Sequence, residues 1–248
     1  MKGVILAGGM GTRLNPLTKV TNKCLLPVYN KPMIYYPIEF LVASNVVDIL
    51  LVCGGNAAGE FLRVLGNGEQ FGLKHLHYTY QADALGIAHA LWLAREFVGD
   101  DDMCVVLADN VFENDIRATV EHCRKYGAQG AIILGTEVEH PEHYGVIMKD
   151  HEGKVVGIIE KPKNPQSNWI ATGLYIYDKS VWGFIDSLSP SARGELEITD
   201  VNNHYIKKNA LTAVDMQGWW ADCGENFDGY LDACNKAREL SRRKAQHP

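Results

Sequence analysis

Apolar runs and amphipathic segments alternate along the first half of the chain. Continuous apolar runs predict buried strands at Gly3–Ala7, Asp48–Cys53, His75–Tyr80, Cys104–Ala108 and Ala131–Thr136. Helical periodicity between these runs predicts helices at about Met33–Ser44, Gly59–Leu65, Leu85–Phe97 and Ile116–Tyr126. Because the strands are apolar throughout and do not alternate with polar residues, we expect both faces of their sheet to be covered. The pattern predicts an α/β fold with a Rossmann-like, doubly wound, mainly parallel sheet.

The second half of the chain has a more β-rich pattern. Strands are predicted at Tyr144–Lys149, Lys154–Ile159, Ile170–Tyr177 and Leu211–Met216, and Asp150–Gly153 has the composition of a hairpin turn. Helices are predicted near Ser180–Leu188, Glu197–Lys208 and Phe227–Ala245. Since no repeat, low-complexity segment or linker divides the chain, we expect one continuous domain over residues 1–248.

Composition and charge narrow the class of protein. The chain has 248 residues, 46% of them hydrophobic, which is ordinary for a globular protein. A net charge of −6 argues against a general nucleic-acid binder, although local cations can still hold phosphates. No signal-peptide pattern or membrane-spanning apolar stretch is present, so we expect a cytoplasmic protein without membrane contact. The six cysteines form no Cys-x-x-Cys pair and are expected to be buried, reduced thiols.

A glycine-rich loop follows the first predicted strand. Gly8, Gly9 and Gly11 precede Thr12 and Arg13, and Lys23 comes ten residues later, before Leu25, Leu26 and Pro27. Inward-pointing amides and two cations suit a polyphosphate. The spacing is neither that of a P-loop nor that of the dinucleotide fingerprint. No acidic residue ends the second strand either, which disfavours a dinucleotide-binding oxidoreductase.

Two aspartates are candidate ligands for a hard cation. Asp109 follows the strand Cys104–Ala108, and ligands bind at the carboxyl ends of parallel strands. Asp222 lies in the segment Gly218–Gly224. Taken singly, Asp109 fits a turn or helix cap, and Asp222 fits an Asx-turn before Gly224. Two carboxylates beside phosphates, however, are a typical Mg²⁺ site.

Other polar and small residues suit recognition of a base and a sugar phosphate, although each also fits an ordinary structural role. Gln81 and Gly86, at a strand-to-helix turn, offer the donors and acceptor that match the O4/N3 edge of thymine or uracil. Lys161 and Arg193 are candidate partners of an anion, against the alternatives of a surface ion pair and a solvated loop arginine. At expected strand ends and edges, candidate sugar contacts are Glu160, Tyr144, Gly145, Thr172 and Gly173.

The loop motif resembles the signature of sugar-phosphate nucleotidyltransferases, Gly-Gly-x-Gly-Thr-Arg-Leu followed by Lys-x-Leu-Leu-Pro. Similarity to the glucose-1-phosphate thymidylyltransferase branch extends over essentially the whole chain. The segments that carry it are Lys31–Tyr36, Leu107–Asn110, Tyr144–Val146, Glu160–Pro162, Thr172–Tyr175, Pro190–Asp200 and Trp220–Gly224. In the loop after Gln81 a frequent proline of the branch is missing, while Gly86, Ala88 and Ala90 keep its pattern.

The resemblance implies an enzyme that transfers a thymidylyl group from dTTP to α-D-glucose 1-phosphate, releasing dTDP-glucose and pyrophosphate. It implies Mg²⁺ on Asp109 and Asp222, with Arg13 and the loop amides on the leaving pyrophosphate and Lys23 near the α-phosphate. Lys161 and Arg193 would hold the second anion. Residues 1–140 would form mainly the nucleotide side, and residues 141–248 the sugar-phosphate side, a smaller β-rich insertion, and the C-terminal helix.

Some alternatives stay open at this stage. Another base or another hexose 1-phosphate fits the same motifs, and so does a catalytically inactive nucleotide-sugar-binding regulator, although the retained charged residues speak against the regulator. The similarity is to a short form of the branch, without the extra C-terminal segment of the longer enzymes. A homo-oligomer is also expected from the resemblance.

Overall fold

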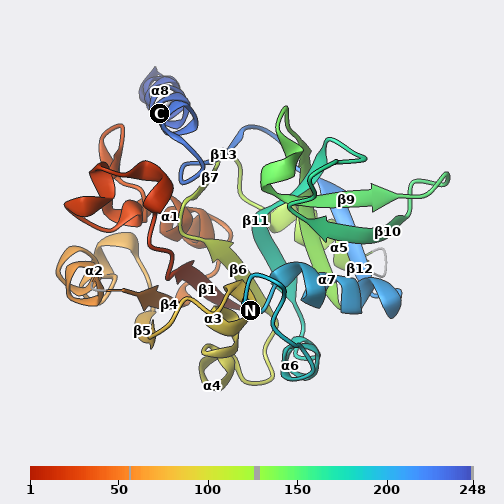
Figure 1. Ribbon diagram of the computed structural model, residues 1–248. Helices are drawn as coiled ribbons and strands as arrows, with labels where there is room; N and C mark the ends of the chain where they lie inside the picture. The colour runs from red at the N-terminus through yellow and green to blue at the C-terminus, as the bar shows by residue number, and fades with distance from the viewer. Residues whose placement is uncertain (56, 126–128, 247–248) are drawn as a thin grey trace.

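A nine-stranded sheet forms the centre of the protein in the computed structural model, which describes residues 1–55, 57–125 and 129–246 (Figure 1). Its strand order is β10-β9-β11-β6-β1-β4-β5, and β8 joins β11 to β12. The strands of the sheet are β1 (Lys2–Ala7), β4 (Asp48–Gly54), β5 (His75–Gln81), β6 (Met103–Leu107), β8 (Ala131–Glu137), β9 (Gly145–Lys149), β10 (Val155–Glu160), β11 (Trp169–Tyr177) and β12 (Leu211–Asp215).

Most of these strands run in one direction. β1, β4, β5 and β6 pair in parallel, as do β8 and β12, while β11 is antiparallel to β6, β8 and β9. Residues 170–171 of β11 pair with β9, and residues 174–177 pair with β6 on the same edge. The sheet therefore forks at Thr172 and Gly173, where β6 and β9 diverge from their common neighbour.

Helices cover both faces of the sheet, as the continuous apolar strands require. The helices are α1 (Tyr35–Ala43), α2 (Ala58–Leu65), α3 (Ile87–Trp92), α4 (Arg95–Val98), α5 (Arg117–Lys125), α6 (Val181–Asp186), α7 (Ile198–Lys207) and α8 (Phe227–Gln246). Alternate residues of β1 point to opposite sides: Val4 packs in a cluster with α3, α4, α6 and α7, and Ile5 packs in a cluster with α1 and α2. The predicted doubly wound α/β fold is confirmed.

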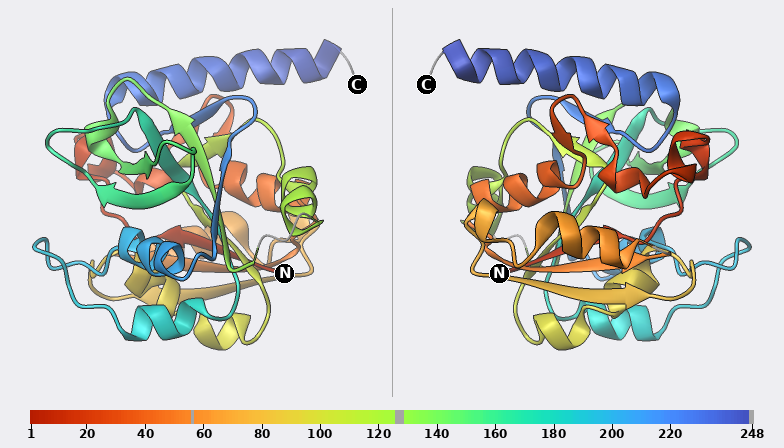
Figure 2. Two further views of the ribbon diagram at one scale, coloured as in Figure 1. Left: turned by 90° about the vertical axis from the view of Figure 1, so that its right-hand side faces the viewer. Right: turned by 90° about the vertical axis from the view of Figure 1, so that its left-hand side faces the viewer.

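Two short ribbons lie outside the main sheet. They are the antiparallel pairs β2 (Pro27–Val28) with β3 (Lys31–Pro32) and β7 (Asn110–Phe112) with β13 (Trp220–Asp222). Helix α8 packs beside β2 and β13 and lies across the end of the molecule away from the N-terminus (Figure 2). Within the described residues, no helix combines the length and the apolar character needed to cross a membrane.

The structure corrects the sequence predictions in three places. The helix expected at Leu85–Phe97 is two helices, α3 and α4, because the Ala94 amide bonds to the Leu91 carbonyl in a tightened turn between them. Thr172 and Gly173, expected at a strand edge, lie inside β11. The strand His75–Tyr80, expected to be buried, is the edge strand β5, and its residues up to Tyr80 are exposed or half-buried. Tyr126, the expected end of one helix, falls outside the described residues.

Candidate active site

A cleft of about 370 Å³ opens at the carboxyl ends of β1, β5 and β6, beside the fork in the sheet. The sequence predictions are brought together here. The predicted residues that line the cleft are Gly8, Gly9, Gly11, Thr12, Arg13, Lys23, Gln81, Gly86, Asp109, Tyr144, Gly145, Glu160, Lys161, Thr172, Gly173 and Asp222. Arg193 is the predicted site residue outside this lining.

The glycine loop packs closely against its surroundings. Gly11 has a φ of 64°, and a Cβ there would lie 2.8 Å from Cβ of Lys23. A Cβ on Gly54, at the end of β4, would lie 2.9 Å from the Cα of Gly8. Side chains at these positions would collide with backbone or with Lys23, so glycine is required by space as well as by conformation. The exposed side chain of Arg13 stands at the open end of this loop.

The β7–β13 ribbon brings the two candidate metal ligands together. Asp222 is in register with Asn110, the neighbour of Asp109, and the Cys223 amide donates to the Asp109 carbonyl at 2.8 Å. The Asp222 carboxylate also accepts from the Gly224 amide at 2.9 Å, so the Asx-turn considered from the sequence is present. This turn and a role as metal ligand are compatible, because a carboxylate has several lone pairs.

Asn110 fixes the position of Asp109, a role that was not predicted from the sequence. Its amide group donates to Asp109 Oδ1 at 3.1 Å, and its Oδ1 accepts from Trp220 Nε1 at 2.7 Å and from the Gly173 amide at 2.9 Å. A Cβ on Gly173 would lie 2.6 Å from this side chain. Asn110 therefore connects β6, β11 and β13 behind the carboxylates. The sequence feature that could have indicated this role is the position of Asn110 directly after Asp109.

Charge is concentrated around the same carboxylates. Lys23 Nζ forms an ion pair and hydrogen bond with Asp109 Oδ2. Burial is the largest influence on the pKa of Lys23 and would lower it, but the charges around it, Asp109 foremost, together raise it. Burial would likewise raise the pKa of Asp109, but the charge of Lys23 and the hydrogen bonds from Lys23 and Asn110 together lower it. Burial and the charge of Asp109 raise the pKa of Asp222 to about 7. Two carboxylates share one lysine, so a further cation would be favoured between them.

Polar groups also converge on the opposite wall of the cleft. Glu160 Oε2 accepts from Thr199 Oγ1 at 2.5 Å, and Lys161 Nζ lies 3.8 Å from Glu160 Oε1. Lys161 has a φ of 42° directly after β10, so the chain turns sharply where its ammonium enters the cleft. Thr199, from the first turn of α7, was not singled out in the sequence.

Arg193 is held by carboxylates behind this wall. Its guanidinium lies 2.7 Å from Glu197 Oε2, 3.1 Å from Glu195 Oε2 and 3.7 Å from Glu160 Oε1. The bond to Glu197 raises the pKa of Arg193 despite partial burial. Arg193 is also an exposed loop residue, as in the alternative considered from the sequence, but it is ion-paired. Its role at the sugar phosphate stays a prediction.

Glu225 links residues at the mouth of the cleft and was not predicted. Its two oxygens accept from Tyr144 Oη at 2.5 Å and contact His143 Nδ1 at 2.5 Å. The Tyr144 ring lies edge-on to Trp220, with centroids 5.7 Å apart. Glu225 is a single carboxylate in a loop, with no sequence pattern around it that could have signalled this contact. The contacts hold Tyr144 in the lining of the cleft.

The side-chain amide of Gln81 has a fixed orientation. Its Nε2 lies 3.2 Å from the Gly86 carbonyl and 3.0 Å from His89 Nδ1, so both amide protons have acceptors inside the protein. Its Oε1 faces Gly8, where a Cβ would lie 2.5 Å away. Gln81 therefore presents an acceptor to the cleft and not the donor–acceptor pair expected from the sequence alone.

The chain is similar to known proteins over most of its length. The family model described as nucleotidyl transferase matches residues 2–239. A glucose-1-phosphate thymidylyltransferase of Neisseria meningitidis is 42% identical over 228 residues, which are 90% of this chain and 78% of that protein. The corresponding protein of Xanthomonas campestris is 44% identical, with 90% and 76% covered.

Solved structures show the same fold. A Bacillus anthracis structure, described as a glucose-1-phosphate thymidylyltransferase in complex with sucrose, is 46% identical with a TM-score of 0.89, covering 96% of this chain and 95% of that one. A UDP-glucose pyrophosphorylase complexed with UDP-glucose is 24% identical with a TM-score of 0.82, covering 96% and 98%, and is similar in fold. The chain therefore belongs to the nucleotidyl transferase family.

Proposed function

We propose that this protein is a glucose-1-phosphate thymidylyltransferase. It joins dTTP and α-D-glucose 1-phosphate to give dTDP-glucose and pyrophosphate. The observation that carries the proposal is one cleft in which a glycine loop with Arg13 faces Lys161 across the carboxylates Asp109 and Asp222. The relatives named above bear the same activity in their names and align over 90% of the chain.

The reaction is an in-line displacement. A phosphate oxygen of the sugar phosphate attacks the α-phosphorus of dTTP, a new P–O bond forms, and the bond to the β-phosphate oxygen breaks. Both substrates are anions, so positioning and charge neutralisation supply most of the rate enhancement. Arg13 and the loop amides bind the departing pyrophosphate, Lys23 lies next to the α-phosphate, and Lys161 binds the phosphate of the sugar.

Mg²⁺ fits the carboxylate pair. Asp109 and Asp222 offer hard oxygen donors, and because burial and the charge of Asp109 raise the pKa of Asp222, a further cation would stabilise its ionised form. When bound, the ion would neutralise phosphate charge as the transition state forms. Lys23 favours the ionised form of Asp109 and Asn110 fixes the position of its carboxylate, so that Asp109 and Asp222 could hold the ion.

Base recognition follows from the fixed amide of Gln81. The Oε1 acceptor matches the N3–H of thymine or uracil, with the Gly86 amide as a donor to O4. Cytosine has an acceptor at N3 and would face Oε1 without a hydrogen bond. Uridylyl transfer is the second candidate function, because no described contact of Gln81 or Gly86 reads the C5 methyl group.

The test is a pyrophosphate-release assay with purified protein, Mg²⁺ and a grid of triphosphates against hexose 1-phosphates. Fastest turnover with dTTP and glucose 1-phosphate is expected. Fastest turnover with UTP would favour the second candidate. Binding of dTDP-glucose without turnover of any pair would identify an inactive regulator and contradict the proposal.

A further inference from the structure

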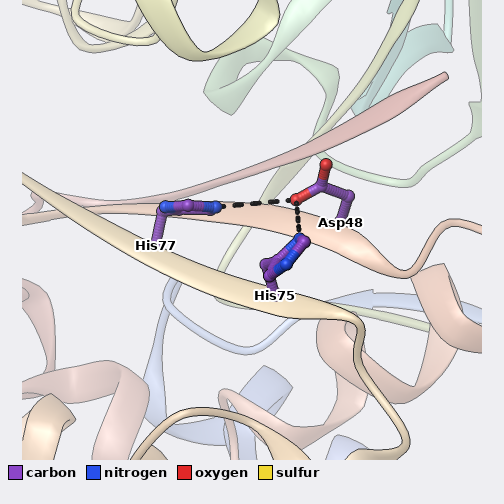
Figure 3. Close-up of side chains that lie close together, drawn as sticks. All are labelled: Asp48, His75 and His77. Atoms are coloured by element: carbon purple, nitrogen blue, oxygen red, sulfur yellow. Dashed lines mark ion pairs between the residues drawn. The ribbon is translucent and has the colours of Figure 1, made fainter.

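A second group of metal-binding side chains lies at the other end of the sheet. His75 and His77 are two residues apart on the edge strand β5, so their side chains share one face. Asp48, the first residue of β4, is in register with His75. The group is about 20 Å from the cleft, counting six residues of β4 at about 3.3 Å each. Figure 3 shows the three side chains converging on one point.

The spacing of the donor atoms suits direct coordination. Asp48 Oδ1 is 3.5 Å from His75 Nδ1 and 3.7 Å from His77 Nε2, and the three donor atoms lie within 4.8 Å of one another. Two ligands of a tetrahedral zinc ion, each bonded at about 2.0–2.1 Å, are about 3.3 Å apart. An ion equidistant from the three atoms therefore needs only small side-chain movements.

The Asp48 carboxylate points a buried oxygen without a hydrogen bond at this position. Oδ1 is inaccessible to solvent, and no hydrogen bond from the described residues reaches it. The other oxygen, Oδ2, is paired with Lys2 Nζ at 3.2 Å. A buried carboxylate oxygen without a donor is unfavourable, and a metal ion would relieve it.

Neighbouring groups hold the ligands in place. Lys2 Nζ lies 4.5 Å from the centroid of the Phe97 ring, and the His77 ring packs 5.1 Å from the same ring. Lys2 and Phe97 thus orient one oxygen of Asp48 and the imidazole of His77, the kind of outer support that metal ligands need. His75 and His77 are each 52% exposed, which leaves water free to complete the coordination.

We propose that Asp48, His75 and His77 bind a divalent transition-metal ion, of the class of Zn²⁺, Co²⁺ or Ni²⁺. Two imidazoles and one carboxylate suit these ions, whereas Mg²⁺ prefers oxygen donors alone. The site is thus chemically distinct from the carboxylate pair in the cleft. An ion here would link the edge strand β5 to β4 and stabilise that edge of the sheet.

The experiment is calorimetric titration of the chelator-treated full chain with Zn²⁺, in excess Mg²⁺ to occupy the cleft, at a pH where imidazole is neutral. We expect His75→Gln and His77→Gln each to weaken Zn²⁺ binding by about tenfold or more, since even loss of an outer partner costs that much. The rise of Tm on adding Zn²⁺ should also be lost. Circular dichroism checks that both variants fold.

Two control variants test whether Zn²⁺ binds at this site and not elsewhere. His140→Gln removes another exposed histidine beside a carboxylate, Glu142 at 3.4 Å, and should bind Zn²⁺ as the wild type does. Asp222→Asn should do the same. Wild-type affinity in His75→Gln and His77→Gln overturns the proposal, as does loss of binding in Asp222→Asn or His140→Gln. An anomalous difference peak between the three side chains in Zn²⁺-soaked crystals would support it directly.

Discussion

At the scale of single residues, Asp109 is the side chain on which the proposed chemistry depends most. Asp109→Asn removes a negative charge where a metal ion and phosphates meet. We expect turnover to fall at least about 100-fold, equivalent to about 3 kcal/mol of transition-state stabilisation. Steady-state kinetics at saturating Mg²⁺ measure the loss, and circular dichroism verifies the fold. Asp101→Asn, in an exposed loop, is the control and should keep wild-type turnover.

The protonation of Asp222 gives a prediction on stability. Its pKa in the folded, metal-free protein is about 7, above the ordinary value of 3.8. Between these values the folded state holds a proton that the unfolded state releases, so stability falls as pH rises toward 7. Asp222→Asn cannot ionise and escapes this loss. With chelator present, the stability of the variant relative to the wild type should rise from about pH 4 to about pH 7 and change little at higher pH.

Urea denaturation at several pH values measures this difference. Added Mg²⁺ should remove the disadvantage of the wild type at high pH, because the ion needs the ionised carboxylate. A stability difference that does not change with pH would mean that Asp222 titrates normally and that its site is not short of positive charge.

Base selection is a second residue-scale consequence. Since the amide protons of Gln81 are bonded to Gly86 and His89, the wild type should use dTTP and UTP and use CTP, ATP and GTP poorly. The C5 methyl of thymine is worth about 1 kcal/mol in an apolar contact, so the preference for dTTP over UTP should be about fivefold. Gln81→Ala should lower kcat/KM with both. Efficient use of CTP would show that Oε1 does not face the base, and Gln217→Ala serves as the control.

At the scale of elements, the fork of the sheet requires a glycine at position 173 of β11, because there is no room for a side chain there. Gly173→Ala would place Cβ 2.6 Å from Asn110, in a packed position between β6 and β9. We expect a loss of about 1–3 kcal/mol in the free energy of unfolding and a fall in kcat, because Asn110 would lose its hold on Asp109. Gly183→Ala in α6 is the matched change: nothing lies within 4 Å, and it should gain about 0.5–1 kcal/mol. Equal effects of the two changes would contradict this account.

Elements could be predicted from the sequence where they are long. The bounds of the long strands were predicted to within a residue or two. In β1, β4 and β6 burial on both faces leaves an unbroken apolar signal, whereas β5 was predicted as buried and is largely exposed or half-buried at the sheet edge. The ribbon β7–β13 was not predicted, since three-residue strands have no period to detect. The break between α3 and α4 was missed because Trp92–Ala94 contains no proline or glycine, and the turn is set by packing.

The candidate site was predictable only in part. Gly8–Arg13 and Lys23 are close in sequence and formed a recognisable phosphate motif. Asp109 and Asp222 are far apart in sequence, and their pairing came from family resemblance, because spacing alone says nothing about a ribbon that forms on folding. Glu225 and the acidic partners of Arg193 are single charges whose contacts arise from tertiary structure. The spacing of His75 and His77 indicates that both lie on one face of a strand. Their partner Asp48 lies on a neighbouring strand, so its proximity could not be predicted from spacing.

At the scale of the whole molecule, the cleft joins two halves of one sheet, and the halves should serve different substrates. Arg13 follows β1, while Lys161 follows β10 on the far side of the fork. Arg13→Ala should lower kcat and change KM for glucose 1-phosphate little, because its contact strengthens on the departing pyrophosphate.

Lys161→Ala should raise KM for glucose 1-phosphate at least about tenfold and leave KM for dTTP nearly unchanged, since one charge-assisted contact is worth about 1.5–3 kcal/mol. Steady-state kinetics in which each substrate is varied against saturating levels of the other separate these effects. Lys163→Ala, an exposed lysine two residues farther on, controls for loss of local charge. If Lys161→Ala impairs both substrates equally, the division into a nucleotide half at residues 1–140 and a sugar-phosphate half at residues 141–248 is wrong.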